Sequence, residues 1–317
     1  MTAPTVEPFT SDHIAPAGAL LAERHRRQRQ VEPLLSARYE DPAQAAERIR
    51  DAWSQEGASG AAAVSGGELV GYLIGSPKSD AIWGPNQWVE NAGHAVSEPE
   101  VIRDLYAHMA GPWVEAGRTR HYAAVPATDP ALVEAWFRLS FGQQHAYGIR
   151  EVPATAWPAN VREATSDDVE GLVDIGPLVE IQHAASPTFA GLPDDSPDEL
   201  RDEIMNEIAS TRTGSLVVAV DGRIVGGVVV APIEESGMHT GLARPEGQCI
   251  LGWQATRPEV RGTGIGVALA DGAFAWAHEH GYTTMVTDWR IANLLSSRFW
   301  PRRGFRTSFL RMYRSIP

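Results

Sequence analysis

Apolar and polar residues in the second half of the chain follow patterns that predict a mixed α/β fold. Two β-rich runs, 215–220 and 224–231, flank Asp221-Gly222, a dipeptide typical of tight hairpin turns. A helix-start signal, Thr165-Ser-Asp-Asp168, precedes apolar residues at helical spacing. We expect strands at 161–164, 215–220, 224–231, 248–256, 282–289 and 306–313, and helices at 169–181, 198–208, from about 266 to 280, and 293–300. The predicted order is β-α-α-β-β-β-α-β-α-β.

The first half of the chain repeats features of the second. The segment Val6-Glu-Pro-Phe-Thr-Ser-Asp12 precedes Val161-Arg-Glu-Ala-Thr-Ser-Asp167 by 155 positions, and the same offset relates Gly67-Glu-Leu-Val-Gly71 to Gly222-Arg-Ile-Val-Gly226. Pro99-Glu-Val101 mirrors Pro258-Glu-Val260, and Trp136-Phe-Arg-Leu-Ser-Phe141 resembles Phe299-Trp-Pro-Arg-Arg-Gly-Phe305. Four matches in one order indicate two copies of one fold. We predict two domains, 1–152 and 160–317, joined where Pro153 and Pro158 discourage regular structure.

The composition is consistent with two domains, and it limits the classes of molecule that the protein is expected to bind. The 317 residues are about twice a typical domain. A net charge of −13 argues against nucleic acid or anionic membrane as a general partner, and it is compatible with an amine-bearing substrate. The single cysteine, Cys249, excludes an internal disulfide and a Cys-rich metal cluster. With no apolar run of membrane length and no secretory pattern at the N-terminus, we expect a cytoplasmic protein.

A glycine-rich segment between a predicted strand and a predicted helix carries the most informative chemistry. It reads Thr256-Arg-Pro-Glu-Val-Arg261-Gly262-Thr263-Gly264-Ile265-Gly266. Such a turn lets the backbone approach a ligand, and its unpaired N–H groups at a helix start attract a pyrophosphate. It is not a P-loop, because Gly266 is followed by Val267-Ala268 rather than by Lys and Ser or Thr. Nor does the spacing fit the dinucleotide fingerprint Gly-x-Gly-x-x-Gly.

The segment instead fits Arg-x-x-Gly-x-Gly at Arg261, Gly264 and Gly266, and here the chain resembles the GNAT superfamily of N-acetyltransferases. A second signature follows at Asn293-Leu-Leu-Ser296-Ser-Arg-Phe299-Trp300, with Gly304-Phe305 after it. The resemblance covers residues 161 to about 313. It implies two tandem GNAT-type α/β (α+β) domains, each a mixed, mostly antiparallel twisted sheet flanked by helices. The first copy would be degenerate.

The resemblance also implies an activity and a set of binding residues. The activity would be transfer of an acetyl group from acetyl-CoA to a primary amine of a small molecule by direct attack, with no metal. The CoA-binding residues would be Gln254, Ala255, Thr256, Arg261, Gly262, Thr263, Gly264, Ile265, Gly266, Asn293 and Ser296.

The catalytic residues depart from the family pattern. Trp300 stands where the family has its usual tyrosine acid, with Tyr282 and Tyr313 as possible replacements. Gln248 stands where many members have a carboxylate base, so Glu246, two residues earlier, is the candidate base. Further candidate bases are His183 and His239, whereas Cys249 reads as a core residue.

The first copy lacks the phosphate turn. There the segment Val101-Ile-Arg-Asp-Leu105 replaces the glycines, and Asp104 would repel a pyrophosphate. We read Trp83, Trp88 and Trp113 as packing residues. A catalytically silent acyl-CoA-binding module and a protein or peptide N-acetyltransferase remain alternatives, and the oligomeric state stays open.

Overall fold

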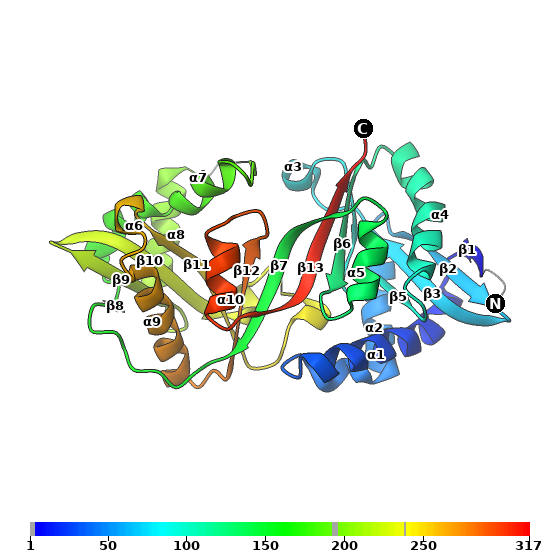
Figure 1. The fold of residues 1–317 in the computed structure, drawn as a ribbon, viewed down its shortest axis with the longest axis horizontal. Helices are drawn as coiled ribbons and strands as arrows, with labels where there is room; N and C mark the ends of the chain where they lie inside the picture. Colours follow the sequence, from blue (N-terminus) through cyan, green and yellow to red (C-terminus); the bar gives the residue numbers. More distant parts are fainter. Residues whose placement is uncertain (1–3, 192–195, 238) are drawn as a thin grey trace. The chain divides into compact units, whose positions relative to one another are not determined.

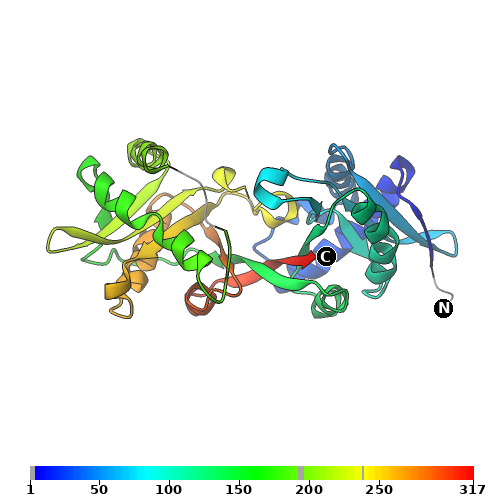
Figure 2. The ribbon, with the colours of Figure 1, turned by 90° about the horizontal axis from the view of Figure 1, so that it is seen from above.

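A computed structural model describes residues 4–191, 196–237 and 239–317, in which the chain forms two compact units (Figures 1 and 2). Unit 1 comprises Met1–Tyr147, Thr240–Pro245 and Thr307–Pro317, and unit 2 comprises Gly148–His239 and Glu246–Arg306. Each unit is described separately below. No helix among the described residues is long and apolar enough to cross a membrane.

Unit 2 contains the strands and helices of the second sequence copy. Its strands are β8 (Arg162–Glu163), β9 (Gly214–Val220), β10 (Arg223–Pro232), β11 (Cys249–Thr256) and β12 (Thr284–Arg290). Its helices are α6 (Val169–Ile175), α7 (Leu178–Ala184), α8 (Pro197–Ala209), α9 (Ile265–Glu279) and α10 (Ser296–Arg302). Short 3-10 turns lie at Ser166–Asp168, Ile233–Glu235 and Pro258–Val260.

The sheet of unit 2 has the order β8-β9-β10-β11-β12, with the end of β7 (Gly142–Glu151) beyond β12. Strands β8 to β11 are antiparallel to their neighbours, and β11 and β12 are parallel. The predicted hairpin joins β9 and β10, and Asp221 and Gly222 both have positive φ, as a type I′ turn requires. The mixed, mostly antiparallel sheet predicted from the sequence is therefore confirmed.

Helices cover both faces of this sheet, and two adjacent glycines of β10 show which helix lies on which face. A Cβ on Gly226 would meet Leu269 of α9 at 2.9 Å, whereas one on Gly227 would meet Leu172 of α6 at the same distance. Successive residues of a strand point to opposite faces, so α9 and α6 pack on opposite sides. On the α6 side the core contains Val169, Leu172, Ile175, Ile204, Val217 and Ile224.

Two predicted helices of this unit differ from those observed. The apolar stretch at 169–181 is not one helix, because Gly176 and Pro177 separate α6 from α7 and the ring of Pro177 cannot continue an α-helix interior. The helix predicted at 293–300 begins three residues later, at Ser296. Asn293 lies outside it, and its side-chain oxygen accepts a hydrogen bond from the Leu295 N–H at 3.0 Å.

Unit 1 has a similar element order, with one short helix (Asp80–Trp83) and one strand (Asn86–Val89) added. Its strands are β1 (Thr5–Pro8), β2 (Ser59–Ser65), β3 (Glu68–Gly75), β4 (Asn86–Val89), β5 (His94–Val96), β6 (Arg120–Pro126), most of β7, and β13 (Arg306–Ser315). Its helices are α1 (Ile14–Val31), α2 (Pro42–Trp53), α3 (Asp80–Trp83), α4 (Val101–Glu115) and α5 (Pro130–Phe137). One sheet has the order β1-β2-β3-β5, and the remaining strands pair in the order β4-β6-β13-β7.

The duplication is visible in local geometry. Thr10 and Thr165, which correspond in sequence, both begin a capping box ahead of a 3-10 turn, with φ of −132° and −123° and ψ of 171° and 172°. The hairpin turn of the first copy, Gly66-Gly67, has positive φ at both residues, like Asp221-Gly222. The same short sequence therefore forms the same turn in both halves.

The compact units do not coincide with the predicted domains 1–152 and 160–317. Strand β13, at the end of the second copy, pairs antiparallel with β6 of the first, from Phe309 opposite Pro126 to Ser315 opposite Arg120. Residues 240–245 and 307–317 of the second predicted domain therefore belong to unit 1, and residues 148–152 of the first belong to unit 2. A boundary placed by proline and repeat spacing cannot detect this exchange, because strand partners are chosen over long sequence distances.

Buried histidines make the stability of unit 1 depend on pH. His25 and His94 are fully buried, and their ring nitrogens lie 2.8 Å from the Ser36 oxygen and 3.1 Å from the Ala124 oxygen. Burial lowers the pKa of His25 to about 4 and that of His94 to about 3. Below about pH 6.5 the unfolded chain therefore binds more protons than the folded chain. The stability that comes from keeping His25 and His94 neutral is present above that pH and is lost as the pH falls toward 4.

We expect the free energy of unfolding to fall by about 2 kcal/mol per buried histidine between pH 7 and pH 5. Urea titrations at the two pH values measure this change. His25→Gln can keep a side-chain N–H for Ser36 but does not titrate, so it should remove one histidine's share. An equal pH dependence in this variant would contradict the assignment.

Candidate functional site

The glycine-rich turn lies between β11 and α9, as predicted. Gly262 and Gly264 have φ of +81° and +96°, and Gly264 is the residue immediately before α9. A Cβ on either glycine would have no neighbour within 4 Å, and residues 261–264 are exposed. These glycines are thus required by backbone conformation and not by protein packing.

Main-chain N–H groups of this turn are available to a ligand. The first hydrogen bond of α9 joins the Ala268 N–H to the Gly264 oxygen at 2.9 Å. The N–H groups of Ile265, Gly266 and Val267 therefore have no preceding helical carbonyl to bind. Arg261 is exposed beside them, and its guanidinium donates to Gln182 of α7 at 3.2 Å. Together with the helix dipole, these groups favour an anion such as a phosphate.

Strands β11 and β12 diverge next to this turn. Among the described residues their register ends at Ile250 opposite Val286, and one side-chain bond follows, from the Thr287 hydroxyl to the Leu251 oxygen at 2.9 Å. On its other edge β11 has a bulge, because Val229 pairs with Trp253 but Val230 pairs with Leu251, leaving Gly252 as an extra residue. Beyond Leu251, the β12-facing edge of β11 can bind an extended ligand.

The residues predicted to contact CoA come together from three elements. Gln254 of β11 donates to the Gly266 oxygen at 3.1 Å, and a Cβ on Gly266 would lie 3.9 Å from Phe299 of α10. The Gln254 side-chain oxygen and the Ser296 hydroxyl are buried without a hydrogen-bond partner in the described part of the chain. Such atoms cost free energy unless a ligand or water binds them. The donor set therefore fits an amide-bearing arm next to a pyrophosphate.

Charged and imidazole side chains lie near the place where β11 and β12 separate. Asp288 follows Val286 by two positions, so continuation of the parallel register would place it level with Gly252. Its charge acts on His183 at the end of α7, which packs on β11, and on His239 before β11. Burial lowers the pKa of His183, Arg290 lowers it further, and Asp288 opposes them. Burial lowers the pKa of His239 to about 4 despite the Asp288 charge.

Asp288 was missed by the sequence analysis. It is the one acidic residue within the predicted strand 282–289, and an isolated carboxylate in an otherwise apolar and hydroxyl-bearing strand was the available signal. Its significance depends on where β12 leaves β11, which the sequence pattern does not give.

Glu246, the predicted base, lies ahead of the place where β11 and β12 separate. It is exposed in the loop before β11, six positions ahead of the bulge at Gly252. Gln248, which replaces the expected carboxylate, is buried, and its side-chain oxygen has no hydrogen-bond partner among the described residues.

The three aromatic candidates pack against other aromatic side chains. Trp300 is buried between Phe299 and Phe305, with ring centroids 4.8 and 5.5 Å away. Tyr282 lies ahead of β12, six positions from Asp288, and stacks on Trp276. Tyr313 belongs to unit 1, where it packs on Tyr122 at 4.9 Å.

Cys249 has the surroundings of a core residue, as the sequence indicated. Its thiol is buried and contacts the Thr284 oxygen at 3.7 Å. Burial raises the pKa of this thiol to about 12, so it is not a thiolate near neutral pH.

The described residues of unit 1 contain no equivalent glycine turn. Helix α4 begins directly after Glu100, whose φ of −64° is helical, and Asp104 lies in its first turn. The buried Arg24 donates to the main-chain oxygens of Asn91 and of His94, the first residue of β5. These contacts occupy main-chain acceptors that an arm-like ligand would need. Among the described residues, no group of three or more His, Cys, Asp or Glu could hold a metal ion.

Comparison with known proteins gives a family for one segment and a fold for the chain. The sequence model of the acetyltransferase (GNAT) family matches residues 178–305. No curated protein matches the sequence significantly. Solved structures similar to this chain include the following three.

A GCN5-related N-acetyltransferase from Sphaerobacter thermophilus is 13% identical, with a TM-score of 0.57, and the match covers 98% of this chain and 95% of that chain. A GCN5-related glucosamine N-acetyltransferase region of a fungal multi-domain β-N-acetylglucosaminidase is 13% identical, with a TM-score of 0.51, and the match covers 99% of this chain and 38% of that one. A tandem GNAT protein from the clavulanic acid biosynthesis pathway is 14% identical, with a TM-score of 0.49 and 99% coverage of both chains.

Proposed function

We propose, from the premise that residues 178–305 belong to the GNAT acetyltransferase family, that the protein transfers an acetyl group from acetyl-CoA to a primary amine of a small molecule. The observation that carries the proposal is the exposed glycine turn at the start of α9, placed beside the divergence of β11 and β12. A phosphate-binding turn and an unpaired strand edge together suit a long substrate with a pyrophosphate at one end and amides along its length.

We assign the turn to the pyrophosphate of CoA. The main-chain N–H groups from Gly262 to Gly266 would bind phosphate oxygens, and Arg261 would add a guanidinium that pairs with them. The helix dipole of α9 acts in the same direction, because its positive end faces the turn. Thr263 helps to hold the shape, since its hydroxyl donates to the Val260 oxygen at 2.7 Å.

The amide-bearing arm would follow β11 toward the divergence. Main-chain groups of Gln254, Ala255 and Thr256 would bind it, and the buried Ser296 hydroxyl would gain a partner. Asn293 has a different role in our assignment, because its side-chain oxygen is engaged by Leu295 at the start of α10. Its contribution is to fix the position of Ser296 rather than to bind the arm through that oxygen.

The thioester of acetyl-CoA supplies an activated acetyl group. In the proposed reaction the amine nitrogen forms a bond to the carbonyl carbon, the carbon–sulfur bond breaks, and the sulfur leaves as a thiolate. A main-chain N–H of β11 near the Gly252 bulge would stabilise the negative charge that develops on the carbonyl oxygen. Thiols have pKa values of about 8.5, so the thiolate can be protonated from solvent near neutral pH.

We assign Asp288 and His183 to the amine. The Asp288 carboxylate would attract an ammonium to the mouth of the divergence, and the neutral His183 imidazole would accept the proton that the nitrogen loses. Burial keeps the pKa of His183 below its ordinary value, so this side chain is available as an acceptor at neutral pH. Glu246 is a second candidate base, and its exposed loop position would require a chain of waters.

Release of free thiol from acetyl-CoA, in the presence of a panel of amines, tests the proposal. Small diamines, amino sugars and a lysine-containing peptide are tested in parallel. We expect turnover with at least one small amine and stoichiometric binding of acetyl-CoA by calorimetry. Turnover restricted to the peptide would favour a protein acetyltransferase. No binding of acetyl-CoA at saturating concentration would reject the proposal.

A catalytically silent acyl-CoA-binding module is the second candidate, and two observations favour it. Trp300 is buried where the family has its tyrosine acid, and Gln248 replaces the usual carboxylate. This candidate predicts binding of acetyl-CoA without thiol release across the whole panel.

A further inference from the structure

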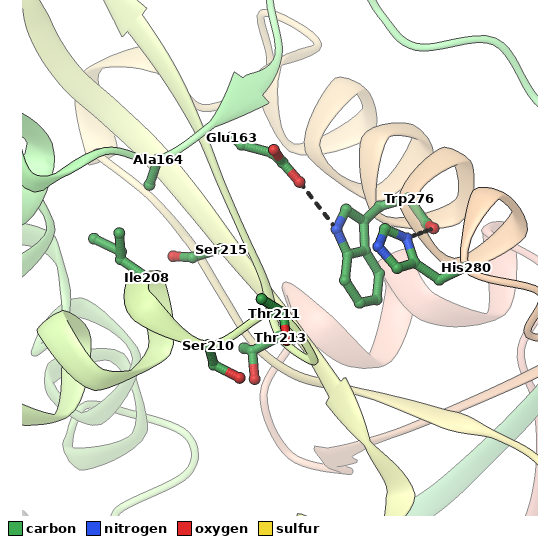
Figure 3. A pocket seen from close by; sticks show the side chains of 9 residues that line it. All are labelled: Glu163, Ala164, Ile208, Ser210, Thr211, Thr213, Ser215, Trp276 and His280. Carbon is green, nitrogen blue, oxygen red and sulfur yellow. Dashed lines mark hydrogen bonds between the residues drawn. The ribbon is translucent and has the colours of Figure 1, made fainter.

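A polar pocket lies in unit 2 at the end of α9 that is farther from the glycine turn. It encloses about 260 Å³, and Figure 3 shows its lining side chains. They are Glu163, Ala164, Ile208, Ser210, Thr211, Thr213, Ser215, Trp276 and His280. Gly264 directly precedes α9 and His280 directly follows it. Because an α-helix rises 1.5 Å per residue, the pocket is roughly 20 Å from the turn. The proposed acetyl-transfer site uses none of these residues.

A buried hydroxyl faces the pocket. Ser215 of β9 is only 6% exposed and lines the cavity, and the described residues offer its hydroxyl no hydrogen-bond partner. The neighbouring Gly214 faces the opposite side of the sheet, where a Cβ would lie only 2.6 Å from the Trp276 ring. A ligand or water in the pocket can bind this hydroxyl.

The pocket carries one negative charge and several neutral polar groups. The Glu163 carboxylate accepts a hydrogen bond from the Trp276 indole at 3.1 Å, and it forms no ion pair within the described chain (Figure 3). His280 stacks on that indole at 3.8 Å, and its Nδ1–H donates to the Trp276 oxygen at 2.8 Å. In the neutral ring this leaves Nε2 as an acceptor toward a ligand.

The two arginines next in sequence to lining residues each pair with a carboxylate. Arg162 forms a bidentate pair with Asp168 at 2.7 and 2.8 Å, and Arg212 pairs with Glu234 at 3.7 Å. An anion would therefore meet the Glu163 charge without a free cation to offset it. A ligand with a positive group and several hydroxyls matches the lining better, because a hydroxyl can both donate to and accept from Ser and Thr side chains.

We propose that this pocket binds a small amino polyol, a compound with one ammonium group and several hydroxyls. The ammonium pairs with Glu163, and the hydroxyls bind Ser215 and the Ser and Thr side chains of the segment after α8. The volume equals that of about nine water molecules at about 30 Å³ each, which suits a compound of monosaccharide size. The proposal does not depend on acetyl transfer.

The test uses the full chain and the indole N–H resonance of Trp276, assigned by its loss in Trp276→Phe. D-glucamine is titrated at pH 7, with D-glucitol as the matched compound that lacks the ammonium. We expect a saturable shift of the Trp276 signal with D-glucamine and at least ~10-fold weaker binding of D-glucitol, since one charge-assisted hydrogen bond is lost. Trp253 and Trp289, on β11 and β12, report binding at the other site.

Two variants and one control localise the effect. Glu163→Gln keeps an oxygen for the indole but removes the charge, and it should weaken D-glucamine binding by about 10-fold. Ser215→Ala should weaken it by about fivefold. Asp202→Asn removes an exposed carboxylate of α8 outside the pocket and should leave binding unchanged.

Three results would overturn the proposal. They are no Trp276 shift at 50 mM D-glucamine, equal binding of D-glucitol, and equal weakening by Asp202→Asn and Glu163→Gln. A shift confined to Trp253 and Trp289 would assign the compound to the acetyl-transfer site instead and would likewise reject the pocket. Preserved dispersion of the other indole signals shows that each variant is folded.

Discussion

Gly264→Leu is expected to weaken acetyl-CoA binding by at least ~100-fold while the chain remains folded. Gly264 has a φ of +96°, which an L-residue adopts at a cost of roughly 1–2 kcal/mol. Relaxation of this strain would rotate the N–H groups of the turn away from the pyrophosphate, and each lost charge-assisted hydrogen bond is worth about 1.5–3 kcal/mol. Isothermal calorimetry with acetyl-CoA measures the change.

Gly281→Leu is the matched control, because Gly281 follows the other end of the same helix. Its φ is +77°, and a Cβ there has no neighbour within 4 Å, as at Gly264. The two substitutions should cost similar stability, but only Gly264→Leu should change affinity for acetyl-CoA. Equal losses in both variants would attribute the effect to folding. Normal binding by Gly264→Leu would remove the turn from consideration as the phosphate site.

Asp288→Asn is expected to lower kcat/KM for the amine by about 10- to 100-fold with little change in acetyl-CoA affinity. The substitution keeps the size of the side chain but removes the charge that would draw the ammonium to the place where β11 and β12 separate. One hydrogen bond to a charged group is worth about 1.5–3 kcal/mol. Steady-state kinetics with the amine found in the panel measure kcat/KM, and calorimetry measures acetyl-CoA binding.

The pH profile separates this role from a structural one. Because burial and Arg290 lower the pKa of His183, the acid limb of kcat/KM should lie below about pH 6.5, the ordinary imidazole value. Asp288 raises the pKa of His183, so Asp288→Asn should move the limb to lower pH. An unmoved limb would exclude His183 as the proton acceptor. A larger kcat loss in Glu246→Gln than in His183→Gln would make Glu246 the base.

The proposed sites share one scaffold but differ in what positions them. The phosphate turn depends on the backbone of a single loop, and its glycines have no side-chain neighbours to support them. The acceptor groups come from α7, the segment before β11, and β12, which packing around the divergence brings together. Substitutions in the turn should therefore change only the geometry of that loop. The arrangement of the acceptor groups should change with substitutions in any of the three elements that carry them.

The sequence by itself determined the features whose causes are local. Asp221-Gly222 specified a hairpin because both residues tolerate positive φ, and the glycines from 262 to 266 specified a turn that starts a helix. The repeated Thr-Ser-Asp signals specified the same capping turn in both halves. Each depends on a few neighbouring residues, so the prediction needed no knowledge of distant partners.

Only the tertiary structure decided the features that join distant segments. The pairing of β13 with β6 moves the end of the second copy into unit 1, since a strand can satisfy its hydrogen bonds with any free edge of suitable register. The place where β12 leaves β11 makes Asp288 a candidate site residue, and the packing of α8 and α9 against β8 and β9 brings together the residues that line the polar pocket. These outcomes depend on which surfaces meet, and a pattern of apolar and polar positions along one strand does not contain that information.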